Sequence, residues 1–398
     1  MKITKLRGTL VTVSVAVLAA GTLVAAVPAA AAPPQPTSLA QGIPEPDNDP
    51  FYRPADGYEA AEPGDILKQR EVTVTGMKAT QLQVRSTDAK DRPITIVSTV
   101  IVPPAPYPAG ERPLLSYQPA TDSLGDQCNP SYTLRTGTEK ELPLLGMGLA
   151  QGWAVVVTDY QGPRDAYGPG RLEGHAVLDG VRAAKSLDGL SNSPVGLWGY
   201  SGGGLATGWA AELQPSYAPE VELAGVASGG TPADLRAAAD VIDGSPYSGL
   251  LIGAVIGLTR EYPELKELMN AEGEKLEQEA GDMCVGELAA NYPFKRLRSY
   301  TTSPEPLDEP VAKEVLALNT MGSDAPRAPV YLYHSRFDQL IPHASAAKVA
   351  KQWCAQGTEV TFYTDYLSEH IALAISGAPA AVGYLGARFN GVSVPSTC

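Results

Sequence analysis

Short apolar runs that alternate with helical stretches constrain the fold of this chain more than any other feature. After Pro113 the apolar runs lie at 114–117, 153–158, 195–198, 223–227 and 330–333. Runs of this kind are typical of strands that are covered on both faces. Helical stretches separate or follow them at 142–151, 174–187, 202–213 and 344–356. The alternation predicts an α/β protein with a mostly parallel central sheet covered by helices.

The region before Pro113 has a different pattern. Residues 71–75 and 81–85 alternate apolar and polar side chains, and 94–102 is longer and rich in β-branched residues. These three segments suit antiparallel strands at an edge of the sheet. Residues 32–65 are rich in Pro, Asp and Ala with little periodicity, so we expect an extended arm there.

One long interval, residues 241–325, interrupts the alternation of strands and helices. It holds an apolar segment at 247–258, a charged one at 261–279 and a Pro-rich one at 303–310. It is far longer than a plain connection. We expect a mostly helical cap inserted into an α/β body made of 66–240 and 326–398. The alternative is an ordinary second domain with no bearing on catalysis.

The N-terminus carries the features of a secretory signal. Lys2, Lys5 and Arg7 precede an apolar run at 10–27, and small residues follow. This order predicts a signal peptide over 1–31, with cleavage near Ala31, and therefore a secreted protein. The alternative, a membrane anchor, suits the Ala-, Gly- and Thr-rich run less well, and no later stretch looks membrane-spanning.

The net charge and the cysteine content limit the classes of partner and of binding site that this chain can have. The formal net charge is −14, and loss of the signal makes it −17 because only three cations are removed. Such acidity argues against nucleic-acid binding and against simple attachment to anionic lipid. The cysteines are Cys128, Cys284, Cys354 and Cys398. An even number in an exported chain suggests two disulfides, with three pairings open. Neither their spacing nor that of the scattered histidines indicates a metal site, and no cofactor is expected.

Residues 199–203 (GYSGG) fit the Gly-x-Ser-x-Gly pattern. In that pattern the serine stands on a sharp turn between a strand and a helix, and the glycines allow neighbouring backbone to come close. The strand candidate before it and the Ala-rich helix after it favour this interpretation over a chance Gly-rich turn. Ser201 is therefore the predicted nucleophile.

A serine nucleophile needs a base and an acid, which in this fold follow it in the order acid, then histidine. His370 lies just past the strand candidate 360–363, on a loop expected to close over the serine. His334 precedes any later acid, and His343 opens a helix, where a surface imidazole is the ordinary expectation. We predict His370 as the base.

Asp338 follows the strand at 330–333 and is the predicted acid, which would hold the tautomer of His370. Asp365 sits earlier than preferred on the histidine's loop, and Glu369 adjoins the histidine, so both are weaker candidates. The tetrahedral intermediate also needs two backbone N–H donors. Gly202 is one candidate, and the other should lie on 118–126, where no His-Gly-Gly-Gly motif identifies it.

Several further segments resemble the secretory lipase family typified by the yeast lipase A enzymes. They are 49–52 (DPFY), 63–67 (PGDIL) with Arg70, 116–118 (SYQ) with Asp122, 128–132 (CNPSY), 178–180 (LDG), 199–204 (GYSGGG), 216–220 (SYAPE), 229–232 (GGTP), Asp338 and 369–370 (EH). The resemblance covers nearly all of the chain after the signal segment.

The resemblance implies a lipase or esterase with an α/β-hydrolase body and a helical cap over an acyl tunnel. It places the triad on Ser201, Asp338 and His370 and the second oxyanion donor on Asp122. It also implies the disulfides Cys128–Cys284 and Cys354–Cys398. The cap looks compact and is strongly apolar only at 247–258, which argues against a preference for long-chain triglycerides.

The sequence thus predicts a secreted carboxylic ester hydrolase acting on acylglycerols or related small esters, with transient contact to a lipid interface. Leu251, Ile252 and Val255 are candidates to line the acyl tunnel, although this stretch is equally typical of a cap's own core. Two other functions stay open: a serine enzyme of different acyl chemistry, such as a peptidase or acyltransferase, and a catalytically silent surface protein.

Overall fold

A computed structural model describes residues 42–398. The predicted signal peptide and the first residues of the predicted arm lie outside this range. The described part of the arm holds two short 3₁₀ turns, Pro46–Asn48 and Tyr58–Ala60.

Nine strands form one sheet within residues 42–398, in the order β1-β2-β3-β5-β4-β6-β7-β8-β9. The strands are β1 (Ile66–Val74), β2 (Met77–Thr87), β3 (Pro93–Ile101), β4 (Leu114–Gln118), β5 (Ala154–Thr158), β6 (Val195–Tyr200), β7 (Leu223–Gly229), β8 (Val330–Ser335) and β9 (Val360–Asp365). The pairs from β1 to β5 are antiparallel, and those from β5 to β9 are parallel. This is the predicted α/β-hydrolase architecture with an antiparallel edge.

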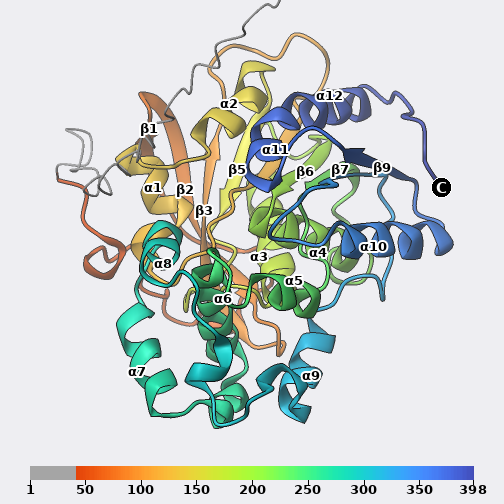
Figure 1. Ribbon diagram of the computed structural model, residues 1–398. Helices are drawn as coiled ribbons and strands as arrows, with labels where there is room; N and C mark the ends of the chain where they lie inside the picture. The colour runs from red at the N-terminus through yellow and green to blue at the C-terminus, as the bar shows by residue number, and fades with distance from the viewer. Residues whose placement is uncertain (1–41) are drawn as a thin grey trace, which may run out of the picture. The chain divides into compact units, whose positions relative to one another are not determined.

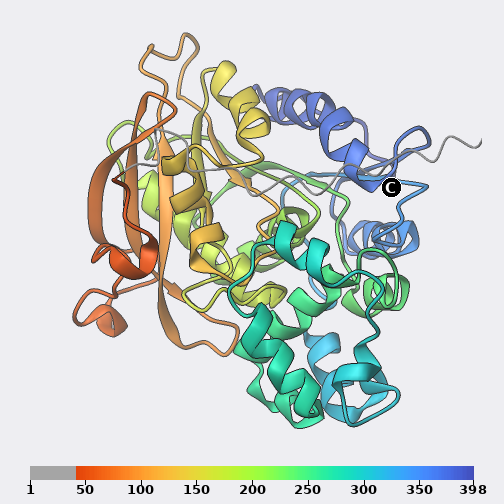
Figure 2. The ribbon, with the colours of Figure 1, turned by 60° about the vertical axis from the view of Figure 1, so that its left-hand side comes forward.

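Helices cover both faces of the sheet (Figures 1 and 2). They are α1 (Pro130–Thr136), α2 (Leu142–Ala150), α3 (Gly170–Lys185), α4 (Gly202–Tyr217), α5 (Leu235–Ile242), α6 (Ser248–Glu261), α7 (Ala271–Ala280), α8 (Val285–Asn291), α9 (Pro310–Leu318), α10 (His343–Ala355), α11 (His370–Ser376) and α12 (Ala378–Phe389). One core joins the sheet to α3, α4 and α10, and a second joins it to α1, α2, α11 and α12.

The two cores lie on opposite faces because side chains alternate along each strand. In β5, Ala154 and Val156 belong to the first core, whereas Val155 and Val157 belong to the second. Every residue of β5 is buried. This double burial explains why the central strands read as continuous apolar runs in the sequence.

Helices α5 to α9 lie between β7 and β8 in the chain (green to cyan in Figure 1). The first of them begins at Leu235, before the predicted start of the insertion at 241. Below, α5–α9 are called the inserted helices.

A disulfide and several hydrogen bonds hold the inserted helices to the segment that follows β4. The disulfide Cys128–Cys284 joins the two, the N–H of Leu124 donates to Met283 O at 3.0 Å, and the N–H of Val285 donates to Ser123 Oγ at 3.0 Å. From α6, the Arg260 guanidinium donates to the carbonyls of Leu124, Arg164, Asp165 and Gly281.

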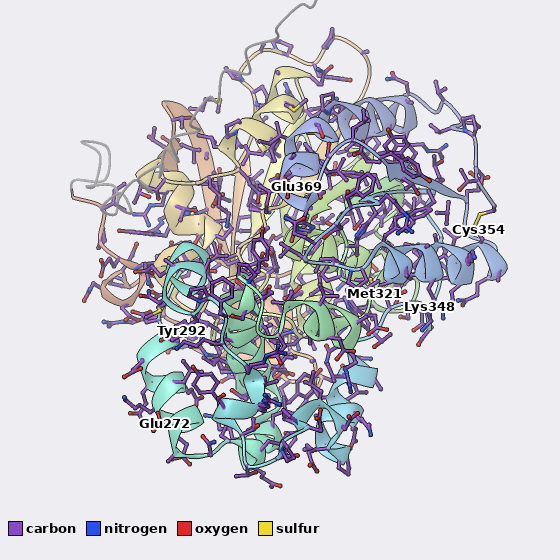
Figure 3. All side chains as sticks on the ribbon, viewed as in Figure 1. Glu272, Tyr292, Met321, Lys348, Cys354 and Glu369 are labelled. Atoms are coloured by element: carbon purple, nitrogen blue, oxygen red, sulfur yellow. A yellow bond between two sulfur atoms is a disulfide. The ribbon has the colours of Figure 1, made fainter. Side chains whose placement is uncertain are left out.

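A second disulfide, Cys354–Cys398, joins α10 to the last residue (Figure 3). Both pairs are those that the family resemblance implies.

Three helices differ from the sequence-based expectation. No helix was expected at α1, α11 or α12, and His370 was expected on a loop, whereas it is the first residue of α11. That helix has only seven residues, and its N-cap is Glu369 instead of Ser, Thr, Asp or Asn. The start of α11 therefore lacks the capping residue on which sequence reasoning depends.

Candidate active site

Ser201 stands between β6 and α4 in a strained conformation, with φ 56° and ψ −121°. Its N–H donates to Gly229 O at 2.9 Å. A Cβ at Gly199 would lie 2.2 Å from Gly203 O, and one at Gly203 would lie 1.9 Å from Gln118 O. The flanking glycines are therefore required by the close approach of backbone, as the sequence pattern predicts.

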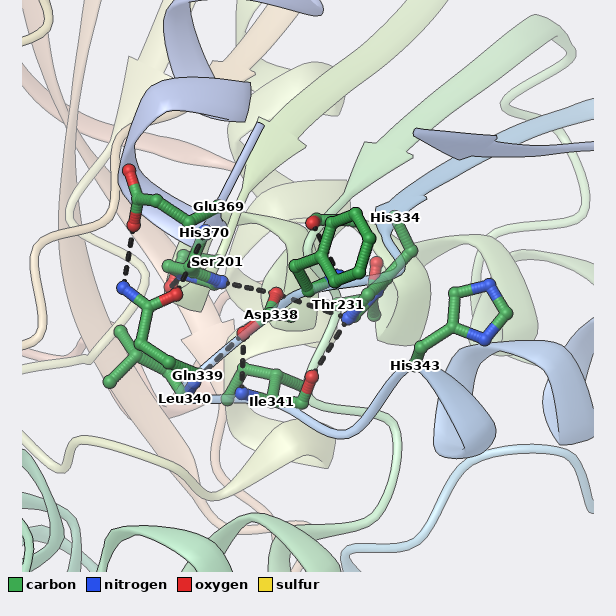
Figure 4. Close-up of polar contacts among 12 residues, drawn as sticks. Ser201, Thr231, His334, Asp338, Gln339, Leu340, Ile341, His343, Glu369 and His370 are labelled. Atoms are coloured by element: carbon green, nitrogen blue, oxygen red, sulfur yellow. Dashed lines mark hydrogen bonds and ion pairs between the residues drawn. The ribbon is translucent and has the colours of Figure 1, made fainter. Parts of the chain in front are cut away.

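The structure brings Ser201, His370 and Asp338 together (Figure 4). His370 Nε2 lies 2.9 Å from Ser201 Oγ, and His370 Nδ1 lies 2.6 Å from Asp338 Oδ2. An ionised carboxylate only accepts hydrogen bonds, so Nδ1 carries the proton and Nε2 is left to accept from the serine hydroxyl. Burial alone would raise the pKa of Asp338, but hydrogen bonds from His334 and His370 hold it well below its ordinary value.

Hydrogen bonds to neighbouring groups hold Asp338 and His370 in place. Asp338 Oδ1 accepts from the N–H groups of Leu340 at 2.9 Å and Ile341 at 2.7 Å. The backbone carbonyl of His370 accepts from Tyr200 Oη at 2.6 Å. The backbone N–H of His370 donates to Gln339 Oε1 at 3.1 Å. The carboxylate is thus oriented by backbone N–H groups, and the backbone of His370 is held by the side chains of Tyr200 and Gln339.

The two competing acids have other partners. Glu369 accepts from the N–H groups of Ile371 and Ala372 and from Gln339 Nε2, so it caps α11 (Figures 3 and 4). Asp365 Oδ1 accepts from the N–H groups of Leu367 and Ser368 and closes the turn after β9. The other candidate base, His343, lies 2.9 Å from Thr364 Oγ1 through its Nε2.

Asp122 and Gly202 face each other beside Ser201. Asp122 is buried with φ 48°, and a Cβ added to Gly202 would lie 1.7 Å from Asp122 Oδ1. Burial raises the pKa of the Asp122 carboxyl. The N–H of Gly202 belongs to the first turn of α4, where N–H groups have no partner within the helix. Both residues suggested as oxyanion donors therefore border Ser201.

An apolar cavity of about 120 Å³ leads away from Ser201, Gly202 and Asp122. Leu251 and Val255 of α6 line it, as does Leu340. Ile252 does not line it: this side chain packs with Leu124 and Leu288 in the core of the inserted helices. The expectation for Ile252 is corrected accordingly, because its position on α6 places it on the face that packs inward.

Comparison with known proteins assigns the family. The family model described as secretory lipase matches residues 128–396. The chain belongs to the secretory lipase family.

Relatives of this secretory lipase extend over most of its length. A protein of Mycobacterium tuberculosis named as a probable inactive lipase is 36% identical over 369 residues, which cover 87% of this chain and 83% of the relative. A secreted triacylglycerol lipase of Malassezia furfur is 32% identical, over 88% of this chain and 78% of its own. The closed-state crystal structure of Candida antarctica lipase A matches with a TM-score of 0.85 and 30% identity, covering 89% of both chains.

Membership makes this secretory lipase a carboxylic ester hydrolase of the α/β-hydrolase fold that is exported from the cell. Within residues 42–398, no single helix is long and apolar enough to span a membrane, and only the bent pair α11–α12 has that length and composition. The same residues contain no His, Cys, Asp and Glu cluster arranged to hold a metal ion.

Several residues around the site escaped sequence reasoning. Tyr160 Oη donates to Pro119 O at 2.6 Å, and Glu141 Oε1 accepts from the N–H of Ala120 at 3.0 Å, so both hold the segment that leads to Asp122. His334 lies 3.1 Å from Asp338 through its Nε2. Glu141 and Tyr160 act on backbone groups 21 and 41 residues away, and no local pattern marks contacts over such separations.

Proposed function

We propose that this secretory lipase cleaves carboxylic esters by a Ser201–His370–Asp338 triad. The observation that carries the proposal is the unbroken chain of contacts from Ser201 Oγ through the imidazole to Asp338 Oδ2, at 2.9 and 2.6 Å. The lipase identity of the family supports it.

Each group has a defined role in the proposed reaction. As Ser201 Oγ attacks the ester carbonyl carbon, His370 Nε2 takes its proton and Asp338 stabilises the resulting imidazolium. The N–H groups of Asp122 and Gly202 donate to the oxyanion. His370 then gives the proton to the departing alkoxide. The alcohol is released, and the acyl group remains bound to Ser201 as an acyl-enzyme. A water molecule, activated by His370, attacks the acyl-enzyme and releases the acid and the free serine.

The inserted helices are proposed to act as a cap over the acyl group of an acylglycerol or related ester. Leu251 and Val255 line the cavity that starts at Ser201. Burial of each CH₂ of an acyl chain is worth about 0.8 kcal/mol. The cavity of about 120 Å³ is similar to the ~150 Å³ cavity that holds one benzene in an engineered protein core. It therefore favours short acyl chains while the cap keeps this arrangement.

A second candidate function is a silent hydrolase fold, because one relative is named as a probable inactive lipase. Labelling with a fluorophosphonate distinguishes the two. We expect the native protein to label once and to hydrolyse p-nitrophenyl esters but not peptide amides. Ser201→Ala should lose both label and turnover while its melting temperature is unchanged. A native protein that folds but neither labels nor turns over would support the silent fold, and an active Ser201→Ala would refute the assigned nucleophile.

A further inference from the structure

His334 contacts the carboxylate of the triad from the side opposite the base. It lies on β8, four residues before Asp338, and the side chains of both residues are fully buried. Its Nε2 is 3.1 Å from Asp338 Oδ2 and 3.0 Å from Ile341 O. Figure 4 shows the Asp338 carboxylate between the two imidazoles.

The surroundings of His334 determine its tautomer. Both neighbours of Nε2 are oxygen acceptors, so Nε2 carries a proton. Nδ1 is buried and has no hydrogen-bond partner among the described residues. A second proton there would leave a buried donor unsatisfied, which is costly. The N–H of His334 is therefore at Nε2, where it faces Asp338 Oδ2 and Ile341 O.

Four N–H groups surround the Asp338 carboxylate. Leu340 and Ile341 donate to Oδ1, His370 donates to Oδ2, and Nε2 of His334 lies 3.1 Å from Oδ2. No Lys or Arg lies within ion-pair distance of Asp338 in the part of the chain that the structure describes. Oδ2 is the atom that receives the His370 N–H. Its position and charge therefore also depend on His334.

We propose that His334 is a positioning residue of the hydrolysis, an inference that rests on the proposed triad. Its N–H fixes Oδ2 against rotation of the carboxylate and takes up part of the negative charge that faces His370. With this donor removed, Oδ2 is held only by the His370 N–H, and more of its negative charge holds the proton of the imidazolium.

Other charged and titratable groups face this site and stay unchanged in the variants of His334. They are Arg336 and His343 next to His334, and Tyr200, Asp365 and Glu369 around Asp338. A difference between variants of His334 therefore isolates the contribution of its N–H.

The experiment compares His334→Gln with His334→Asn in the full chain. The amide nitrogen of Gln reaches about as far as Nε2 and offers a hydrogen to each acceptor, whereas that of Asn is one bond shorter. His343→Gln is the control, because the His343 ring packs against the His334 ring, with centroids 5.9 Å apart, but makes its polar contact with Thr364 Oγ1 and not with Asp338. All kcat values are divided by the concentration of sites titrated with fluorophosphonate, so unfolded protein does not count.

We expect His334→Gln to keep kcat within a few-fold of the native protein. His334→Asn should lose about 10- to 100-fold in kcat, the range for a lost hydrogen bond to a charged group, with KM unchanged. The acid limb of its kcat/KM profile should move to higher pH. Equal kcat and equal pH profiles for Asn, Gln and native protein would overturn the proposal, as would equal losses for Asn and Gln. Failure of the triad itself would appear separately, as activity in Ser201→Ala.

Discussion

At the scale of single residues, the site depends on two strained backbone positions. Ser201 and Asp122 both have φ near +50°, a region that non-glycine residues rarely occupy. Such strain persists only where the surroundings fix it. Glu141, Tyr160 and Gln161 bind backbone groups of residues 119–123, and backbone packs directly against Gly199 and Gly203 on either side of Ser201.

The first prediction concerns Gly202→Ala. The new Cβ would overlap Asp122 Oδ1, so the Asp122 segment must move and the oxyanion donors separate. We expect kcat to fall by about 100-fold or more, as when an oxyanion donor is removed. Gly383→Ala in α12 is the matched control, because its Cβ would meet nothing within 4 Å. Unchanged turnover in Gly202→Ala would argue against Asp122 and Gly202 as a pair of donors.

At the scale of elements, α6 has two apolar faces with different roles. Leu251 and Val255 line the cavity, whereas Ile252 and Ile256 pack with Leu288 in the core of the inserted helices. The apolar run at 247–258 therefore contains both cavity-facing and core positions, because residues one apart on a helix point in different directions.

The second prediction separates the two faces of α6. Leu251→Trp and Val255→Trp should shorten the preferred acyl chain by about two or more carbons, each worth ~0.8 kcal/mol of burial, with little change in melting temperature. Ile252→Trp should instead overpack the core and lower stability by about 1–3 kcal/mol, leaving chain-length preference unaltered. A p-nitrophenyl ester series and calorimetry measure both effects. A chain-length shift in Ile252→Trp alone would reverse the assignment of the faces.

The same helix shows how far sequence reasoning reaches. The buried strands and the glycine elbow could be predicted because each is encoded within a few consecutive residues. Ile252 could not be separated from Leu251, since helical periodicity does not say which face meets the cavity. His334 was set aside on chain order, and its contact with Asp338 depends on how the turn after β8 folds back, a tertiary feature with no local pattern.

At the scale of the whole molecule, buried carboxyl groups set the response to pH. Burial raises the pKa of Glu141, Asp159, Asp165 and Glu212 to about 7. A carboxyl group whose pKa is higher in the folded state favours folding at low pH, and this contribution is lost as the pH rises from about 4 towards 7. Asp338 acts in the opposite sense, because its lowered pKa gives stability that is lost at more acid pH.

The third prediction follows from these signs. The melting temperature should be highest near pH 4–5 and lower by about 5 °C or more at pH 7.5. Asp159→Asn removes one of the groups with a raised pKa and should reduce this decrease. Calorimetry from pH 3 to pH 8 tests it, and a melting temperature that rises between pH 5 and pH 7.5 would contradict it.

The fourth prediction compares the two disulfides. In the chain-entropy model, removal of Cys128–Cys284 and of Cys354–Cys398 costs about 5 and about 4 kcal/mol, from separations of 156 and 44 residues. We expect both double Ala variants to melt at lower temperature, but only Cys128→Ala/Cys284→Ala to lose turnover per titrated site, because that bridge holds the segment after Asp122. Equal turnover in the two variants would show that the bridge has no part in catalysis.

The inserted helices are attached to the segment that follows Asp122 in the sequence. This attachment limits how the insertion can be exchanged between enzymes of this kind. Met283 and Cys284 belong to the insertion, yet their partners Leu124 and Cys128 belong to the body. A graft of residues 241–325 from a relative would therefore replace one partner of each of these contacts and leave the other unchanged. It would also replace the residues that line the cavity. The insertion is not an interchangeable module: an exchange that alters substrate choice has to bring along a matching stretch of body residues from 122 to 128.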